Sequence, residues 1–196
     1  MASRKPRTPP PDTAARDDNM LWRGGQRIAV AKQEDRFTVL APTAAQMERL
    51  RKVSGVQDIK RVNRHVCKVE TTQTERDQVM ASMRSGAFGA VAHHAYKPLD
   101  SEGTIYYLTD KIVVRFRKEA SAAQIEALLA RYKLRLQKEY ALPDTVLVQV
   151  TQASGANPLK IANRLAAEKI VVHAEPNLVN RHGAAHVPSD GLFPRQ

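Results

Sequence analysis

Thr43-Ala-Ala-Gln-Met-Glu-Arg-Leu50 reappears farther along the chain as Ser121-Ala-Ala-Gln-Ile-Glu-Ala-Leu128. In both segments a hydroxyl residue is followed three positions later by Gln, which is the capping-box arrangement at the start of a helix. Apolar residues then follow at helical spacing, so each segment is predicted to form a helix with one buried face. A repeat at a spacing of roughly 75 to 80 residues indicates two related structural units.

The elements predicted around the two segments also occur in the same order. A strand-like run precedes each helix, at 35–40 and at 110–116. The second copy continues with β-branched and alternating runs, a helix that begins at the Asn157-Pro158 pair, and a short apolar strand, so that its strands fall at 134–142, 145–150 and 170–174. The corresponding strands and helix of the first copy fall at 57–63, 65–69, 74–84 and 90–95, with 27–31 as a candidate extra strand.

This order predicts an α+β fold with two tandem ferredoxin-like (βαββαβ) units. Each unit is expected to be an antiparallel sheet with two helices on one face, and residues 24–99 and 104–180 are expected to superpose. The predicted organisation is a disordered leader, a first unit, a second unit and a linker, at 1–20, 21–99, 100–180 and 181–196.

Composition limits the class of protein. The chain has 196 residues and a net charge of +11, and residues 21–99 hold 14 basic against 7 acidic side chains. The single Cys67 excludes an internal disulfide framework and is expected to be a buried structural thiol. The sequence has neither an apolar run long enough for a membrane helix nor a signal-peptide core, so we expect a cytoplasmic protein without membrane contact, with export left open.

The basic first unit is consistent either with an acidic partner or with a merely basic soluble surface. A tandem RNA-binding module is one alternative, because RNA-recognition domains share the βαββαβ plan. Such modules stack bases on aromatic rings of the central strands. The central strands here, His65–Val69 and Thr145–Val150, have no Phe, Tyr or Trp. We therefore do not expect binding to nucleic acid.

The second half of the chain resembles a known family. The matching features are the run Thr109 to Phe116, the Leu142-Pro-Asp144 turn, and the Val172-His-Ala-Glu-Pro-Asn-Leu-Val179 segment. Together they resemble the N-terminal propeptide of subtilisin-like serine proteases, most closely the fervidolysin-like branch. The final segment Asp190-Gly-Leu-Phe-Pro-Arg-Gln196 is similar to that branch's entry into the catalytic domain, which is expected to follow Gln196.

The resemblance implies an intramolecular chaperone and autoinhibitor of a subtilisin-like serine endopeptidase. The partner would be the protease catalytic domain, bound in cis or, as an alternative, in trans by a free-standing inhibitor. The family's catalytic Asp, His and Ser segments do not occur here, so no catalytic residue is expected. No metal or cofactor is expected either. The open face of the sheet is expected to dock on the protease, and the segment after the last strand is expected to lie in its substrate cleft.

Candidate site residues follow from this expectation. Because Pro176 cannot donate a ladder hydrogen bond, the sheet is predicted to end near it. The extended segment beyond is the candidate for binding the protease cleft, and its residues are Asn177, Leu178, Val179, Asn180, Arg181 and His182. His93, His94 and His173 are expected to be ordinary surface or edge side chains. The pair His182 and His186 is not expected to bind a metal.

Overall fold

The structure, a computed structural model, describes residues 19–40, 43–64, 66–85, 90–101 and 103–181. Three of its helices begin where the sequence predicts, and the helix predicted at 74–84 begins two residues later, at Arg76. At α2 (Ala44–Arg51) and α4 (Ala122–Arg131) both capping boxes form, and the Thr43 hydroxyl accepts the Gln46 N–H at 3.2 Å. At α5 (Pro158–Ala166) the Asn157 side chain accepts the Lys160 N–H at 2.9 Å. The fourth α-helix of the described residues is α3 (Arg76–Arg84).

Two of the strands are much longer than predicted. The strand β2 covers Gln26–Leu40 and joins the two predicted runs at its ends, and β6 covers Ile105–Phe116. The remaining strands are β1 (Met20–Arg23), β3 (Asp58–Arg61), β4 (Val66–Glu70), β5 (Ala92–Pro98), β7 (Leu134–Glu139), β8 (Thr145–Val150) and β9 (Val171–Arg181). A 3-10 turn, η1 (Gln152–Ser154), precedes α5.

All nine strands of the described residues belong to one antiparallel sheet, which confirms the predicted α+β class. The order is β3-β4-β2-β5-β6-β8-β7, with β1 paired to β2 and β9 paired to β6. The pairing of β5 with β6, through Ala95–Tyr107 and Tyr96–Tyr106, makes the sheet continuous between the two predicted units. The assignment of two tandem ferredoxin-like units stays a prediction.

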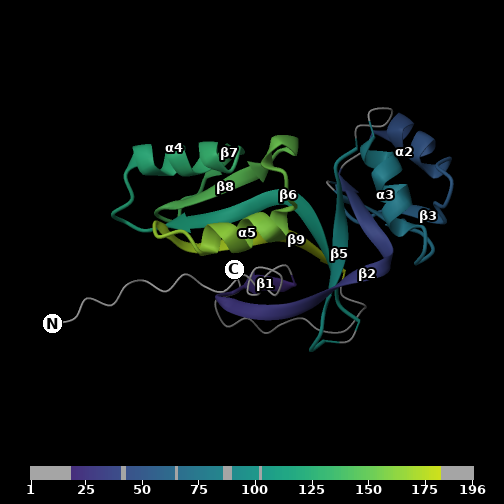
Figure 1. Ribbon diagram of the computed structural model, residues 1–196, viewed down its shortest axis with the longest axis horizontal. Coiled ribbons are helices and arrows are strands. Elements are labelled where there is room, and N and C mark those ends of the chain that lie inside the picture. Colours follow the sequence, from purple (N-terminus) through teal and green to yellow (C-terminus); the bar gives the residue numbers. More distant parts are fainter. Residues whose placement is uncertain (1–18, 41–42, 65, 86–89, 102, 182–196) are drawn as a thin grey trace, which may run out of the picture.

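Each pair of helices covers one face of its part of the sheet (Figure 1). Around α4 and α5, Leu128, Leu129, Ile161 and Leu165 pack in one cluster with strand residues such as Ile112. Around α2 and α3, the buried cluster contains Leu50, Val79, Met80, Met83, Phe37 and Cys67. Cys67 is fully buried, as predicted.

A third buried cluster connects the two halves of the chain. Leu21 and Val30 of the β1–β2 hairpin pack there with Tyr106 and Leu108 of β6 and with Leu159 of α5. The Asn163 amide also donates to the Met20 carbonyl at 2.8 Å. The start of the chain is therefore packed against the second half, across the predicted boundary between residues 99 and 100.

The sheet curls where the two halves meet. The start of β6 packs over the face of the first half that the helices leave open, because Tyr107 lies in a buried cluster with Val66 and Ala95. The Thr38 hydroxyl bridges the curl by donating to the carbonyl oxygens of His93, at 3.0 Å, and Leu108, at 3.4 Å. This curl leaves the β7-β8-β6-β9 half with an uncovered face and creates a cleft between the halves.

Candidate functional site

The face of β7, β8, β6 and β9 opposite α4 and α5 is the first candidate surface. Successive side chains of a strand point to opposite faces of the sheet. Val113 lies between the helix-facing Ile112 and Val114, so its side chain belongs to the open face. The registers place the following residues on this open face: Lys111, Val113, Arg115, Arg135, Lys138, Leu147, Gln149, His173 and Glu175.

The open face has an apolar centre with a polar and cationic rim. Val113 lies directly opposite Leu147 on one side and Glu175 on the other. Arg115 and Arg135 are exposed at the rim. His173 Nε2 lies 2.9 Å from Glu175 Oε1, which places an ionisable pair on the β9 side. An apolar patch inside a charged rim is the usual anatomy of a protein-binding surface.

The predicted cleft-binding segment lies inside the sheet. Leu178, Val179, Asn180 and Arg181 pair with residues of β6 from Leu108 back to Ile105. Leu178 packs partly buried against the cluster of the β1–β2 hairpin, and Val179 packs against the cluster of Tyr107. His182 lies outside the described residues.

The prediction that the sheet ends near Pro176 is therefore wrong. Pro176 pairs with Ile112 beside a register shift, and β9 continues to Arg181. At the shift the Thr109 hydroxyl donates to the Asn177 carbonyl at 3.0 Å and accepts the Lys111 N–H at 3.2 Å. A proline is tolerated in a strand at such a bulge, and on a strand whose sheet partner lies on one side.

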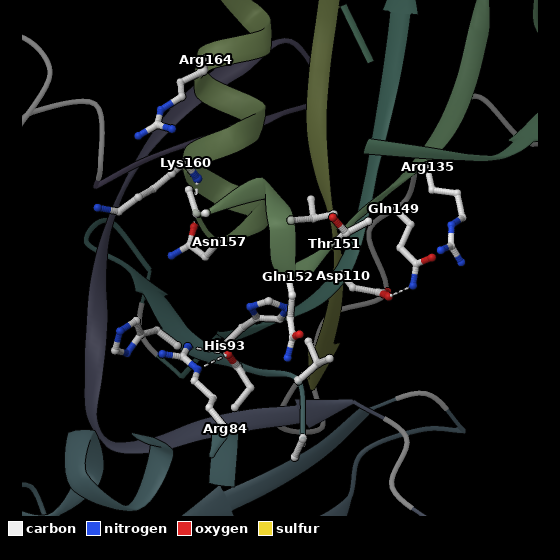
Figure 2. Close-up of a pocket in the computed structure, with 17 residues that line it drawn as sticks. Arg84, His93, Asp110, Arg135, Gln149, Thr151, Gln152, Asn157, Lys160 and Arg164 are labelled. Atoms are coloured by element: carbon white, nitrogen blue, oxygen red, sulfur yellow. Dashed lines mark hydrogen bonds between the residues drawn. The ribbon is translucent and has the colours of Figure 1, made fainter. Parts of the chain in front are cut away.

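A polar cleft of about 660 Å³ is the second candidate site. Its walls are η1 and the start of α5 on one side, and the end of α3 with β5 on the other (Figure 2). The charged side chains along it are Arg84, Asp110, Arg135, Lys160 and Arg164. Asp110 accepts a hydrogen bond from the Gln149 amide at 2.5 Å. The cleft is therefore lined by four cationic groups and one carboxylate.

His93 corrects one sequence expectation. It lies within β5 and is only 7% exposed, because the strand is longer than predicted and β2 pairs with it at this point. Burial, followed by the nearby charges of Arg84 and His94, lowers the pKa of His93 to about 3. The half-buried His94 has its pKa lowered to about 4, chiefly by desolvation. Neither is an ordinary surface histidine, whereas His173 is a half-exposed residue of β9.

Sequence reasoning did not find the cleft. Its residues come from separate segments of both halves, and no short motif joins them. Burial raises the pKa of the Cys67 thiol, which favours the structural role predicted for it. Within the part of the chain that the structure describes, no three His, Cys, Asp or Glu side chains gather as a metal site. None of the helices in that part is long and apolar enough to cross a membrane.

Comparison with known proteins connects the second half to one family. Residues 94–177 match the family model of the fervidolysin N-terminal prodomain. This match confirms the resemblance predicted from the sequence and covers β6 through most of β9. Segment 94–177 is thus similar to a prodomain associated with subtilisin-like proteases.

Two other comparisons add no functional assignment. No curated protein matches the chain. A crystal structure of aspartokinase alpha and beta subunits matches at 13% sequence identity with a TM-score of 0.24, over 63% of this chain and 87% of that chain. A likeness at this level supports no conclusion about fold or function.

Proposed function

We propose that this chain is the propeptide region of a subtilisin-like serine endopeptidase and acts as its folding chaperone and autoinhibitor. The observation that carries the proposal is the match of residues 94–177 to the fervidolysin prodomain family. By binding the native protease and not its unfolded chain, such a partner stabilises the folded enzyme by mass action.

The open face of β7, β8, β6 and β9 is the proposed docking surface. It combines the apolar centre of Val113 and Leu147 with exposed cations, and the exposed Tyr140 lies at its β7 edge with its ring 5.4 Å from Lys138 Nζ. Its central strands β6 and β8 contribute no Phe, Tyr or Trp to the face, which favours a protein partner over single-stranded RNA, whose bases stack on rings of the central strands.

The segment from Asn177 to His182 remains our proposed cleft-binding segment. Within it, Leu178–Arg181 pair with β6 on one side, so in this conformation these residues can offer their other side as an added strand. Entry into a cleft with both sides available would require the pairing with β6 to open.

The division into two tandem ferredoxin-like units is also part of the proposal. The spatial strand orders β5-β2-β4-β3 and β9-β6-β8-β7 support it, because corresponding strands of the two halves occupy the same positions in the sheet. The shared cluster around Leu21 indicates that the proposed units are not independent.

The experiment uses the full chain and a subtilisin-like catalytic domain of the fervidolysin type. Inhibition is measured with a chromogenic peptide, and chaperone activity is measured as protease recovered after dilution from denaturant. We expect inhibition and faster recovery. Val113→Asp and Leu147→Asp should weaken inhibition by at least tenfold, about 1.4 kcal/mol.

Leu99→Asp is the matched control, because Leu99 is 70% exposed and follows β5, outside the four strands of the open face. It should inhibit like the unaltered chain. If the unaltered chain neither inhibits nor assists refolding, the proposal is wrong. Comparing the separate chain with the same chain fused to the catalytic domain distinguishes action in trans from action in cis.

A further inference from the structure

The cleft between the two halves shares Arg135 and Gln149 with the open face but does not include the proposed docking contacts Val113 and Leu147. Figure 2 shows Lys160 on α5 and Asn157 at the N-cap of α5 across from Arg84, with His93 on the floor between Gln152 and Arg84. At about 660 Å³ the cleft lies within the size range of small-molecule sites, about 300 to 1,000 Å³.

Arg84 is held in place in this cleft. Its Nε and Nη2 atoms donate to the Ala92 carbonyl at 3.0 and 2.5 Å. Partial desolvation lowers the pKa of Arg84, and Asp77 and Tyr96 only partly offset this effect. A partly desolvated guanidinium is stabilised when an anion approaches it.

His93 supplies an independent observation. Its Nε2 atom is buried and makes no hydrogen bond within the described residues, and the residue as a whole is only 7% exposed. A buried polar atom without a partner destabilises the fold, because it has lost its hydrogen bonds to water. An oxygen acceptor on a ligand would satisfy it, since a neutral imidazole can carry its hydrogen on Nε2.

The charge of the cleft determines the kind of ligand. Three cationic side chains, Arg84, Lys160 and Arg164, line the part bounded by α3, β5 and α5, whereas Asp110 is already bonded to Gln149. The start of α5 adds the positive end of a helix dipole near Asn157. The lining residues include no Phe, Tyr or Trp, so aromatic bases would find no ring to stack on.

We propose that this cleft binds a small ligand with several oxyanion groups, phosphate or carboxylate, through Arg84, Lys160 and the Nε2–H of His93. Arg84 and Lys160 form charge-assisted hydrogen bonds to the anion from opposite walls. Because these walls belong to different halves of the chain, the bound ligand fixes one half against the other.

The test measures binding of inorganic pyrophosphate to the full chain by calorimetry, with citrate in a parallel titration and sodium chloride at equal ionic strength. We expect a dissociation constant below about 1 mM for at least one oxyanion, equivalent to about −4 kcal/mol. Tighter binding of pyrophosphate identifies a phosphate ligand, and tighter binding of citrate identifies a carboxylate ligand. If both behave like chloride, the cleft only screens charge and the proposal is overturned.

Substitutions locate the site. Arg84→Gln and Lys160→Gln should each weaken binding by at least tenfold. Arg49→Gln on α2 removes the same charge from an exposed position outside the cleft and should leave binding unchanged. His93→Leu should weaken binding more than His93→Gln, which keeps a donor.

A spectroscopic measurement on the unaltered chain tests the site even if a substitution prevents folding. The imidazole resonances of His93 should shift on addition of the oxyanion in the unaltered chain, while those of His173 stay in place. Binding that leaves the His93 resonances unmoved, or that survives Lys160→Gln, would overturn the assignment. These measurements use no protease and are independent of the proposed inhibition.

Discussion

The burial of His93 could not be predicted from the sequence. A His-His pair after an alternating run looks like the end of a strand, yet β5 continues to Pro98 and pairs with β2 and β6. The position of His93 depends on that pairing between distant segments. Its burial, and with it the polar floor of the cleft, becomes apparent only in three dimensions.

The same residue predicts a dependence of stability on pH. The pKa of His93 is lowered from 6.5 to about 3 in the folded chain, so only the unfolded chain takes up a proton as the pH falls through this range. Stability should therefore be full above about pH 6.5 and decrease toward about pH 3, by up to about 1.4 kcal/mol per pH unit.

Chemical denaturation between pH 7.5 and pH 5 checks this expectation. His93→Gln should reduce the decrease of unfolding free energy with falling pH, even if it lowers stability at every pH. His173→Gln, at a half-exposed position, serves as the control. An unaltered pH slope in His93→Gln would show that this imidazole titrates normally.

At the scale of elements, local signals were the most reliable guides. The capping boxes at Thr43 and Ser121 and the Asn157-Pro158 start formed as predicted, because each depends on contacts three residues apart. The extension of β9 past Pro176 was missed, because it depends on β6 as partner and on the bulge at Thr109. The expectation that the segment leaves the sheet was thus wrong for Leu178–Arg181, and its role in binding a protease cleft stays a prediction.

Hydrogen exchange tests the extension of β9. Backbone amides between Leu178 and Arg181 that bond to β6 should exchange slowly in the isolated chain, as do those around Ala174. If the sheet ended at Pro176, the amides after it would exchange within the first time point. Loss of their protection on addition of the protease would show that the segment leaves β6 when it binds.

At the scale of the whole molecule, the repeat correctly predicted the order of elements. It did not predict that the two halves share one sheet and one buried cluster. Each predicted unit has its own helix-covered core, as expected from its amphipathic segments. The joining of β5 to β6 and the packing of the β1–β2 hairpin on α5 could not be predicted, because the strand Met20–Arg23 precedes the repeated part and has no counterpart in the second copy.

The buried cluster shared by the two halves predicts that they unfold together. Leu21 is 1% exposed and packs with Leu159 and Leu108 of the second half, so Leu21→Ala should cost about 2 to 5 kcal/mol. We expect it to lower the unfolding midpoint of the second half as well as that of the first, measured by hydrogen exchange along the chain.

Leu50→Ala provides the comparison, because Leu50 is equally buried but lies in the cluster of α2 and α3. If the two variants destabilise separate halves, the second half folds independently of the hairpin. Equal effects on both halves from Leu21→Ala alone would identify the hairpin as the connection between them.

The length of β6 has a mechanical consequence. On one edge it pairs first with β5 and then with β8, and on the other it runs beside β9 from Ile105 to Phe116. A pull on the chain beyond Arg181 acts along β9 and loads its bonds to β6 in shear. Bonds loaded in shear resist together, whereas bonds that are peeled break one after another. A force applied at this end would therefore meet high mechanical resistance, and β6 would transmit it to both halves of the molecule.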